Sequence, residues 1–282
     1  MCLILFAYNA HPLYSLVLAA NRDEFYARRA LPAHFWQAEP DATSATAPAH
    51  SPSAHSPRVF AGRDVQAGGT WCGITTTGRF SALTNYRDFH ALKEVAPSRG
   101  ALTTTFLFGT MPEDEYARHL QATSAPYNGF TVLFGSFTAT AQELWCYSNV
   151  DNAPKPLEAG IHGLSNAFLN TPWHKVEHGK RLFASALEQY GSNGHDARHL
   201  TSALLDIMTN PTRAHDSELP DTGVGLEMER VLSPMFISTE RYGTRCSTVL
   251  LVERNGNVMA TERTYTTPFT ERSEHRAEFR IQ

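Results

Sequence analysis

The sequence of 282 residues contains no uninterrupted apolar run of about 18 residues, the length that a membrane-spanning helix requires. Cysteine is scarce, and the four cysteines include no C-x-x-C pair, which excludes a disulfide scaffold and a standard zinc ribbon. An excess of positive charge is also lacking, because 28 acidic residues outnumber 24 lysines and arginines and give a net charge of −4. We therefore expect no nucleic-acid partner that binds through bulk charge, although a local basic patch is not excluded, and no transmembrane segment.

The first residues lack the features of a secretory signal peptide. No lysine or arginine precedes Arg22, and Asn9, His11 and Pro12 interrupt the apolar run. A signal peptide requires a positive region followed by an unbroken apolar segment. We therefore expect a cytoplasmic protein whose cysteines stay reduced.

Short apolar runs bounded by turn residues predict a series of strands. The predicted strands cover residues 2–8, 15–20, 59–61, 70–76, 79–85, 130–136, 142–147, 246–254 and 257–264. A capping-box pattern at Thr110 and Glu113 predicts a helix over 110–121, and apolar residues at a period of 3.6 predict helices around 182–190 and 200–207. Because a helix pair lies between two groups of strands, the order predicts an α+β fold with helices layered on mostly antiparallel sheets.

Two segments predict irregular structure. Residues 38–57 consist mainly of Ala, Ser, Pro, Thr and His, a composition with little to bury, and this predicts a low-complexity surface loop. Residues 209–226 are rich in Pro and Asp and predict a long loop. Because the first segment is short for a linker that follows a whole domain, we expect a single domain over 1–282 that carries a loop insertion at about 38–57.

Cys2 occupies the most informative position in the sequence. A small second residue permits removal of Met1, after which Cys2 would carry both a thiol and a free α-amine. The reference pKa of an α-amine is about 7.7–8.0, so a neutral amine can act as the base for the thiol beside it. The alternative is a buried cysteine in a β-strand, which is a common situation.

Four polar residues, 21–24, directly follow an apolar strand. The charge of Arg22 can lower a thiol pKa, and Asp23 can accept a hydrogen bond from an amine. The alternative is a solvated turn with a surface ion pair.

Two asparagines and a further arginine stand at the ends of other apolar runs. Asn85 and Asn166 carry amide groups that can stabilise an oxyanion, although an asparagine at a strand end is more often a turn residue. Arg245 opens a long apolar strand, where it can bind a carboxylate or serve as an edge charge.

Taken together, these segments resemble the NRDE family, the family of the transport and Golgi organisation protein 2 proteins. The resemblance rests on segments in the family's order: Met1-Cys2, LAANRDEFYAR at 18–28, GGTWCGI at 68–74, ALTNYRD at 82–88, YNGF at 127–130, GLSNAFLNTPW at 163–173 and YGTRCSTVLLV at 242–252. It extends from Met1 to about Tyr265, nearly the whole chain. It implies the four-layer αββα sandwich of the N-terminal-nucleophile hydrolases.

The resemblance also implies an activity through relatives of the fold, the cysteine amidases of the penicillin V acylase and bile-salt hydrolase kind. Cys2 would then be nucleophile and base for hydrolysis of a small amide C–N bond in a small-molecule substrate, and no cofactor would be required. Arg22 and Asp23 would flank Cys2. The hydrolases separate their Arg and Asp in sequence, whereas these two are adjacent, and adjacent strand residues face opposite ways.

Other site residues follow from the same resemblance. Asn85 and Asn166 would serve the oxyanion and the amine network, and Arg245 would complete the site. A second function is implied by what has been proposed for family members, namely a non-catalytic protein that handles haem, or an acyl-lipid or coenzyme A ligand, in the same cleft. Haem would need an apolar slot and an axial ligand, and the cysteines and 13 histidines offer too many candidates to name one.

Overall fold

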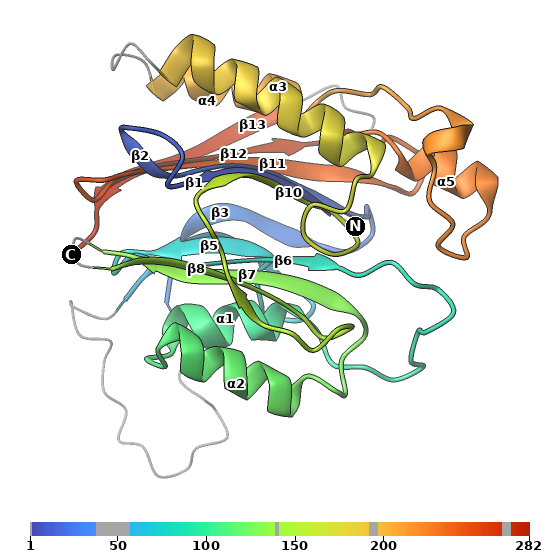
Figure 1. The fold of residues 1–282 in the computed structure, drawn as a ribbon, viewed down its shortest axis with the longest axis horizontal. Helices are drawn as coiled ribbons and strands as arrows, with labels where there is room; N and C mark the ends of the chain where they lie inside the picture. Colours follow the sequence, from blue (N-terminus) through green and yellow to red (C-terminus); the bar gives the residue numbers. More distant parts are fainter. Residues whose placement is uncertain (1, 38–56, 139–140, 192–196, 267–271) are drawn as a thin grey trace.

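A computed structural model describes residues 2–37, 57–138, 141–191, 197–266 and 272–282. Two antiparallel sheets face each other at the centre of the molecule (Figure 1). The first sheet has the order β10 (Gly160–Leu164), β1 (Cys2–Tyr8), β2 (Tyr14–Phe25), β11 (Tyr242–Glu253), β12 (Asn257–Tyr265) and β13 (Arg272–Arg280). The second has the order β3 (Ala30–Trp36), β4 (Val59–Asp64), β5 (Cys72–Thr75), β6 (Arg79–Asn85), β7 (Phe130–Phe137), β8 (Gln142–Ser148) and β9 (Lys155–Pro156).

Helices cover the outer face of each sheet (Figure 1). The first sheet is covered by α3 (His174–Gly191) and α4 (Ala197–Ile207), and the second by α1 (Gly100–Phe108) and α2 (Glu113–Thr123). A short helix, α5 (Leu226–Leu232), lies beside one end of the first sheet. The four layers confirm the predicted αββα sandwich.

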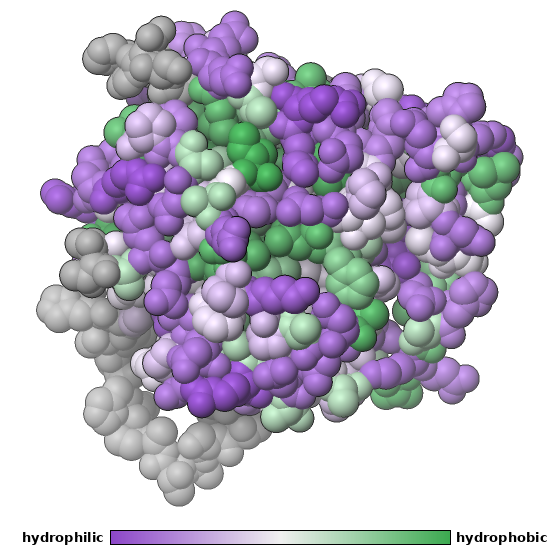
Figure 2. Space-filling view, viewed as in Figure 1, coloured by the Kyte–Doolittle hydropathy of each residue, from purple (hydrophilic) through white to green (hydrophobic). Residues whose placement is uncertain are grey.

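The apolar strands are buried on both faces because they lie between a helix layer and the other sheet. All seven residues of β1 are buried. Ile4 and Phe6 belong to the core between the sheets, whereas Leu3 and Leu5 pack under α3 and α4. This double burial explains why β1 is a continuous apolar run and not an alternating pattern. On the face of the molecule shown in Figure 2, hydrophobic residues appear in small groups among hydrophilic ones.

Two details of the predicted elements are corrected. The helix expected from residue 110 begins at Glu113, and its N-cap is Pro112, which makes no side-chain cap bond, so no capping box forms. Glu113 instead accepts a hydrogen bond from Ser136 Oγ on β7. The segment 209–226, expected to be a loop throughout, contains a 3₁₀ helix at Asp216–Glu218. The predicted insertion lies outside the described residues except for residue 57.

None of the helices within the described ranges is long and apolar enough to cross a membrane.

Candidate active site

Cys2 and Arg22 form a cross-strand pair that faces the space between the two sheets. Cys2 is the first residue of β1, and it lies opposite Arg22 in the antiparallel β1–β2 ladder. Side chains alternate along a strand. Ile4 on the Cys2 face of β1 and Ala20 on the Arg22 face of β2 both belong to the core between the sheets. Cys2 and Arg22 therefore extend the inner face of the first sheet to its end.

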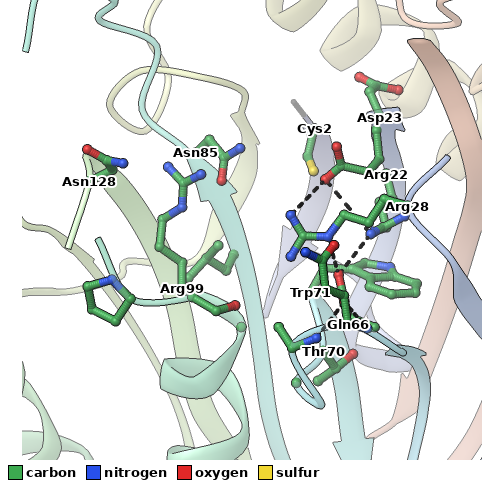
Figure 3. Close-up of a pocket in the computed structure, with 18 of the residues that line it drawn as sticks. Cys2, Arg22, Asp23, Arg28, Gln66, Thr70, Trp71, Asn85, Arg99 and Asn128 are labelled. Carbon is green, nitrogen blue, oxygen red and sulfur yellow. Dashed lines mark hydrogen bonds and ion pairs between the residues drawn. The ribbon is translucent and has the colours of Figure 1, made fainter. Parts of the chain in front are cut away.

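A cavity of about 400 Å³ opens at this end of the sandwich (Figure 3). Its walls come from β1, β2, the loop after β4, the end of β6 and the start of α1. In Figure 3, Cys2, Arg22 and Arg28 lie on one side, and Asn85 and Arg99 lie on the other. The lining residues are Cys2, Arg22, Asp23, Glu24, Arg28, Asp64, Gln66, Ala67, Gly69, Thr70, Trp71, Leu83, Asn85, Ala96, Pro97, Ser98, Arg99, Gly100 and Asn128.

On the Cys2 side, two arginines are held by two carboxylates. Arg22 Nη2 lies 3.3 Å from Asp64 Oδ2, and Arg28 Nε donates to the same oxygen at 2.7 Å. Glu24 Oε2 lies 3.9 Å from Arg22 Nη2 and 3.7 Å from Arg28 Nη1. The Arg22 guanidinium also stacks on Trp71, 4.3 Å from the ring centroid. Because the Arg22 and Asp64 side chains are buried, these contacts fix a cation beside Cys2 in one geometry.

Asp23 extends to the opposite face of β2, as strand alternation requires. Its Oδ1 accepts a hydrogen bond from Thr244 Oγ1 at 2.7 Å, and in Figure 3 its carboxylate points away from the Cys2 sulfur. Burial raises the pKa of Asp23, while the positive charges of the chain N-terminus and of Lys175 lower it. Asp23 is among the residues that line the cavity, but its carboxylate lies on the helix side of the sheet, where it faces the N-terminal end of β1.

Burial governs the ionisation of Cys2. It raises the pKa of the thiol above its ordinary value of 9.0. The positive charge of the chain N-terminus, a hydrogen bond with the Asp23 backbone and the charge of Arg22 each lower the pKa, but they do not offset burial. Because the thiolate is the nucleophile, a buried thiol of raised pKa needs a base close to it.

The two asparagines of the predicted site have different positions. Asn85 ends β6 and lines the cavity. Asn166 is completely buried and donates from Nδ2 to the backbone oxygen of Asn85 at 3.0 Å. Its neighbour Ser165 donates to the backbone oxygen of Cys2 at 3.0 Å. Residues 165 and 166 thus link the ends of β1 and β6, and Asn85 is the member that reaches the cavity.

Arg245 lies outside this cavity. Its Nη1 donates to the backbone oxygens of Phe25, Tyr26 and Arg28 at 3.1, 3.3 and 2.9 Å. Arg245 occupies a register shift in β11, between Thr244 and Cys246. It therefore holds the turn that carries Arg28, and it lines a neighbouring cavity of about 200 Å³ together with Arg22 and Trp71.

Sequence reasoning did not select four residues of the site. Arg28 and Trp71 fall inside the segments that carry the family resemblance, so those segments offered a signal for them. Asp64 and Arg99 belong to no motif, and strand pairing and helix packing bring them to the cavity from distant parts of the sequence.

The donor set around the cavity disagrees with haem. The residues that line the cavity include six charged ones and no His, Met or Tyr. Among the described lining residues, Cys2 is therefore the one side chain of a kind that binds haem iron as an axial ligand. A charged cavity of this kind is not the apolar slot that haem requires.

Comparisons with known proteins agree on a family and on a fold. The model of the family described as "Transport and Golgi organisation 2" matches residues 1–267. The chain is 34% identical over 279 residues to the Transport and Golgi organization 2 homolog of Mus musculus, with 93% of this chain and 92% of that protein covered. It is 35% identical, with the same coverage, to the Transport and Golgi organization protein 2 homolog of Bos taurus.

Among solved structures, the chain resembles the C2A mutant of the conjugated bile acid hydrolase from Clostridium perfringens. The TM-score is 0.50 and the sequence identity 8%, with 100% of this chain and 97% of that chain covered. At this identity, the likeness concerns the fold alone.

Proposed function

This chain belongs to the Transport and Golgi organisation 2 family, and on that premise we propose that it hydrolyses a small amide C–N bond with Cys2 as the nucleophile. The observation that carries the proposal is the position of Cys2, which begins a central strand, lines the cavity and lies opposite a buried, fixed arginine. A likeness of fold supports the proposal, since the conjugated bile acid hydrolase shares the sandwich.

The proposed reaction needs the α-amine that removal of Met1 would expose on Cys2. Met1 itself lies outside the described residues. In the neutral form, the amine takes the thiol proton, and the thiolate attacks the amide carbon. The proton then passes to the nitrogen of the leaving amine as the C–N bond breaks, and water cleaves the resulting thioester to a carboxylic acid and the regenerated thiol.

The positions of groups on both sides of the cavity support these proposed steps. The Asp23 backbone makes a hydrogen bond with the Cys2 sulfur, which lowers the thiol pKa. The Asn85 amide lines the wall across from Cys2 and is the candidate donor to the oxyanion of the tetrahedral intermediate. Arg22 contributes a fixed positive charge as the thiolate forms.

A second candidate is a non-catalytic carrier of an acyl lipid or an acyl-coenzyme A ligand in the same cavity. The raised pKa of Cys2 favours it, because without a neighbouring base the thiol stays protonated near pH 7. For either function we propose the cytoplasm, where the four unpaired thiols would stay reduced.

Turnover and intact mass separate the two candidates. We expect purified protein to lack Met1 by mass spectrometry and to hydrolyse members of a panel of N-acyl amino acids. Cys2→Ala should lower the rate by several orders of magnitude, and Cys2→Ser should retain little, whereas the matched variant Cys72→Ala should keep the activity. Wild-type protein that retains Met1 and binds acyl ligands without turnover would refute the hydrolase and support the carrier.

A further inference from the structure

Arg99 presents a guanidinium group to the cavity from the wall across from Cys2 (Figure 3). Its Nη1 donates to the backbone oxygen of Gly129 at 2.9 Å, which anchors the side chain and leaves its other donors available. Arg99 forms no ion pair with a carboxylate of the described part of the chain. This distinguishes it from Arg22 and Arg28, which share Asp64 and Glu24.

Neighbours of Arg99 add no negative charge on that wall. Asn85 and Asn128 are neutral, and Asn128 Oδ1 already accepts from the Lys93 backbone at 2.8 Å. Burial lowers the pKa of Arg99, the negative charge of Glu24 raises it, and the positive charge of Arg28 lowers it. An arginine remains charged at neutral pH. This wall of the cavity is therefore cationic.

The start of α1 adds to the positive electrostatic potential on this wall of the cavity. Arg99 is its N-cap residue, no side chain caps the helix, and its first turn contains no acidic residue. Gly100, the first helical residue, lines the cavity. The positive end of a helix dipole and an arginine fork both favour an anion.

A second arginine donor also lacks a partner. Arg22 is 5% exposed, and its Nη1 has no hydrogen-bond partner among the described residues, although Nη2 is paired with Asp64. A buried guanidinium nitrogen without an acceptor is costly. Arg22 Nη1 is thus buried without an acceptor from the described chain, and on the opposite wall Arg99 presents N–H donors that no carboxylate of the described chain takes up.

We infer, on the premise of the proposed hydrolysis, that the substrate carries an anionic group, a carboxylate or a phosphate, that binds Arg99. Arg99 is then a specificity-determining residue, and the substrate spans the cavity with its amide at Cys2 and its anion at the start of α1. The cavity of about 400 Å³ limits such a substrate to a small molecule.

Binding to the full-length Cys2→Ala protein tests this inference without turnover. The probes are N-hexanoylglycine, N-hexanoylphosphoethanolamine and the neutral N-hexanoylglycinamide, each titrated by calorimetry. We expect at least one anionic probe to bind at least about tenfold more tightly than the neutral probe. Adding Arg99→Met should weaken that anionic probe by about 10- to 100-fold and leave the neutral probe unchanged. The two anionic probes distinguish a carboxylate from a phosphate.

Two further variants of the Cys2→Ala protein serve as controls, one for the charge at position 99 and one for the loss of an arginine elsewhere. Arg99→Lys keeps the charge and should retain part of the preference, while loss of the bidentate geometry weakens it. Arg118→Met removes an exposed, ion-paired arginine on α2 and should change nothing. Equal affinity for anionic and neutral probes, equal weakening of both by Arg99→Met, or no binding of any probe would overturn the inference. A preference for the anion in Cys2→Ala would stand even if the wild-type protein hydrolysed no amide.

Discussion

The residues 21–24 act on different parts of the molecule because side chains of β2 alternate between two layers. Asn21 faces the helix layer, where its Nδ2 donates to the backbone oxygens of Met208 and Met235 at 2.8 Å each. Arg22 faces the cavity, and Asp23 faces Thr244 on the helix side. One short motif thus joins the helix layer to the site. Its charged residues Arg22 and Asp23 are buried, whereas Glu24 is partly exposed and lies beside Arg28.

Labelling of Cys2 should follow the ionisation of a buried thiol. Because burial raises its pKa above 9.0, the protonated thiol dominates below that pH, and the reactive thiolate is gained as pH rises. In protein that retains Met1, we expect the iodoacetamide rate at Cys2 to rise about tenfold per pH unit from about pH 7 to 9. Peptide mapping by mass spectrometry at each pH would measure it.

The other cysteines are internal controls for this labelling. Burial raises the pKa of Cys72 and of Cys146 to about 12, and neither is expected to react before Cys2, which lines the cavity. Protein without Met1 should react faster near pH 8, where about half of an α-amine of reference pKa is neutral. Labelling of Cys2 that is slower than that of Cys72 would contradict its assignment as an accessible nucleophile.

The site residues that could be predicted from the sequence are those that stand at the ends of apolar strand segments. Cys2, Arg22 and Asn85 stand at the ends of buried strands, so the apolar runs marked them, and the structure places them at one cavity. Arg245 has the same signal, but it lies at a register shift and donates to a turn. Arg99 precedes a helix that sequence analysis missed, so nothing marked it. Whether the predicted residues are catalytic stays a prediction.

At the scale of elements, the missed strands are the sheet edges. The edge strands β10 and β13 bound the first sheet, and β3 and β9 bound the second. An edge strand is covered less than a central one and tolerates charge and proline. Only Ala277 is buried in β13, and β3 contains Pro32, so neither segment shows an apolar run. Central strands such as β1 are buried on both faces, and they were predicted.

Helix α1 was missed for a related reason, and its position depends on glycine. Its sequence GALTTTFLF contains three consecutive threonines, which are weak helix formers, so no helical pattern stands out. A Cβ at Gly69 would lie 2.6 Å from the carbonyl carbon of Gly100. The loop after β4 and the start of α1 therefore meet backbone to backbone beneath the cavity.

We expect Gly69→Ala to separate this contact and to destabilise the protein by about 1–3 kcal/mol, as overpacking does. Urea unfolding would measure the free energy change. The matched variant is Gly68→Asn, because Gly68 has a φ of +72° that asparagine tolerates, and no atom lies within 4 Å of its added Cβ. If the two variants lose the same stability, the close approach of Gly69 and Gly100 does not matter.

At the scale of the whole molecule, stability comes from three stacked apolar layers. One core lies between the sheets, a second lies between the first sheet and α3 and α4, and a third lies between the second sheet and α1 and α2. The order of elements in the sequence predicted helices layered on antiparallel sheets, because amphipathic helices must cover sheets. The four-layer arrangement was predicted from the family resemblance. The order of elements does not reveal which sheet ends meet around a cavity, since that depends on pairing between distant segments such as β2 and β11.

The same layering predicts that residues 40–56 contribute little to stability. They lie outside the described residues, but the strands on either side end at Trp36 and begin at Val59, which are direct partners in the antiparallel β3–β4 ladder. Deleting 40–56 leaves residues 37, 38, 39, 57 and 58 between those partners, a length of about five that suits a hairpin loop. The segment is poor in large apolar residues, so its removal should expose little new surface.

We expect this deletion to leave Tm within a few degrees of the wild-type value in a calorimetric scan. A second variant that replaces 40–56 with a Gly/Ser linker of the same length separates loop closure from side-chain contacts, because closure of a loop depends only weakly on its length. A large fall in Tm in both variants would show that side chains of the segment pack on the sandwich. A fall in the deletion alone would show that five residues strain the β3–β4 connection.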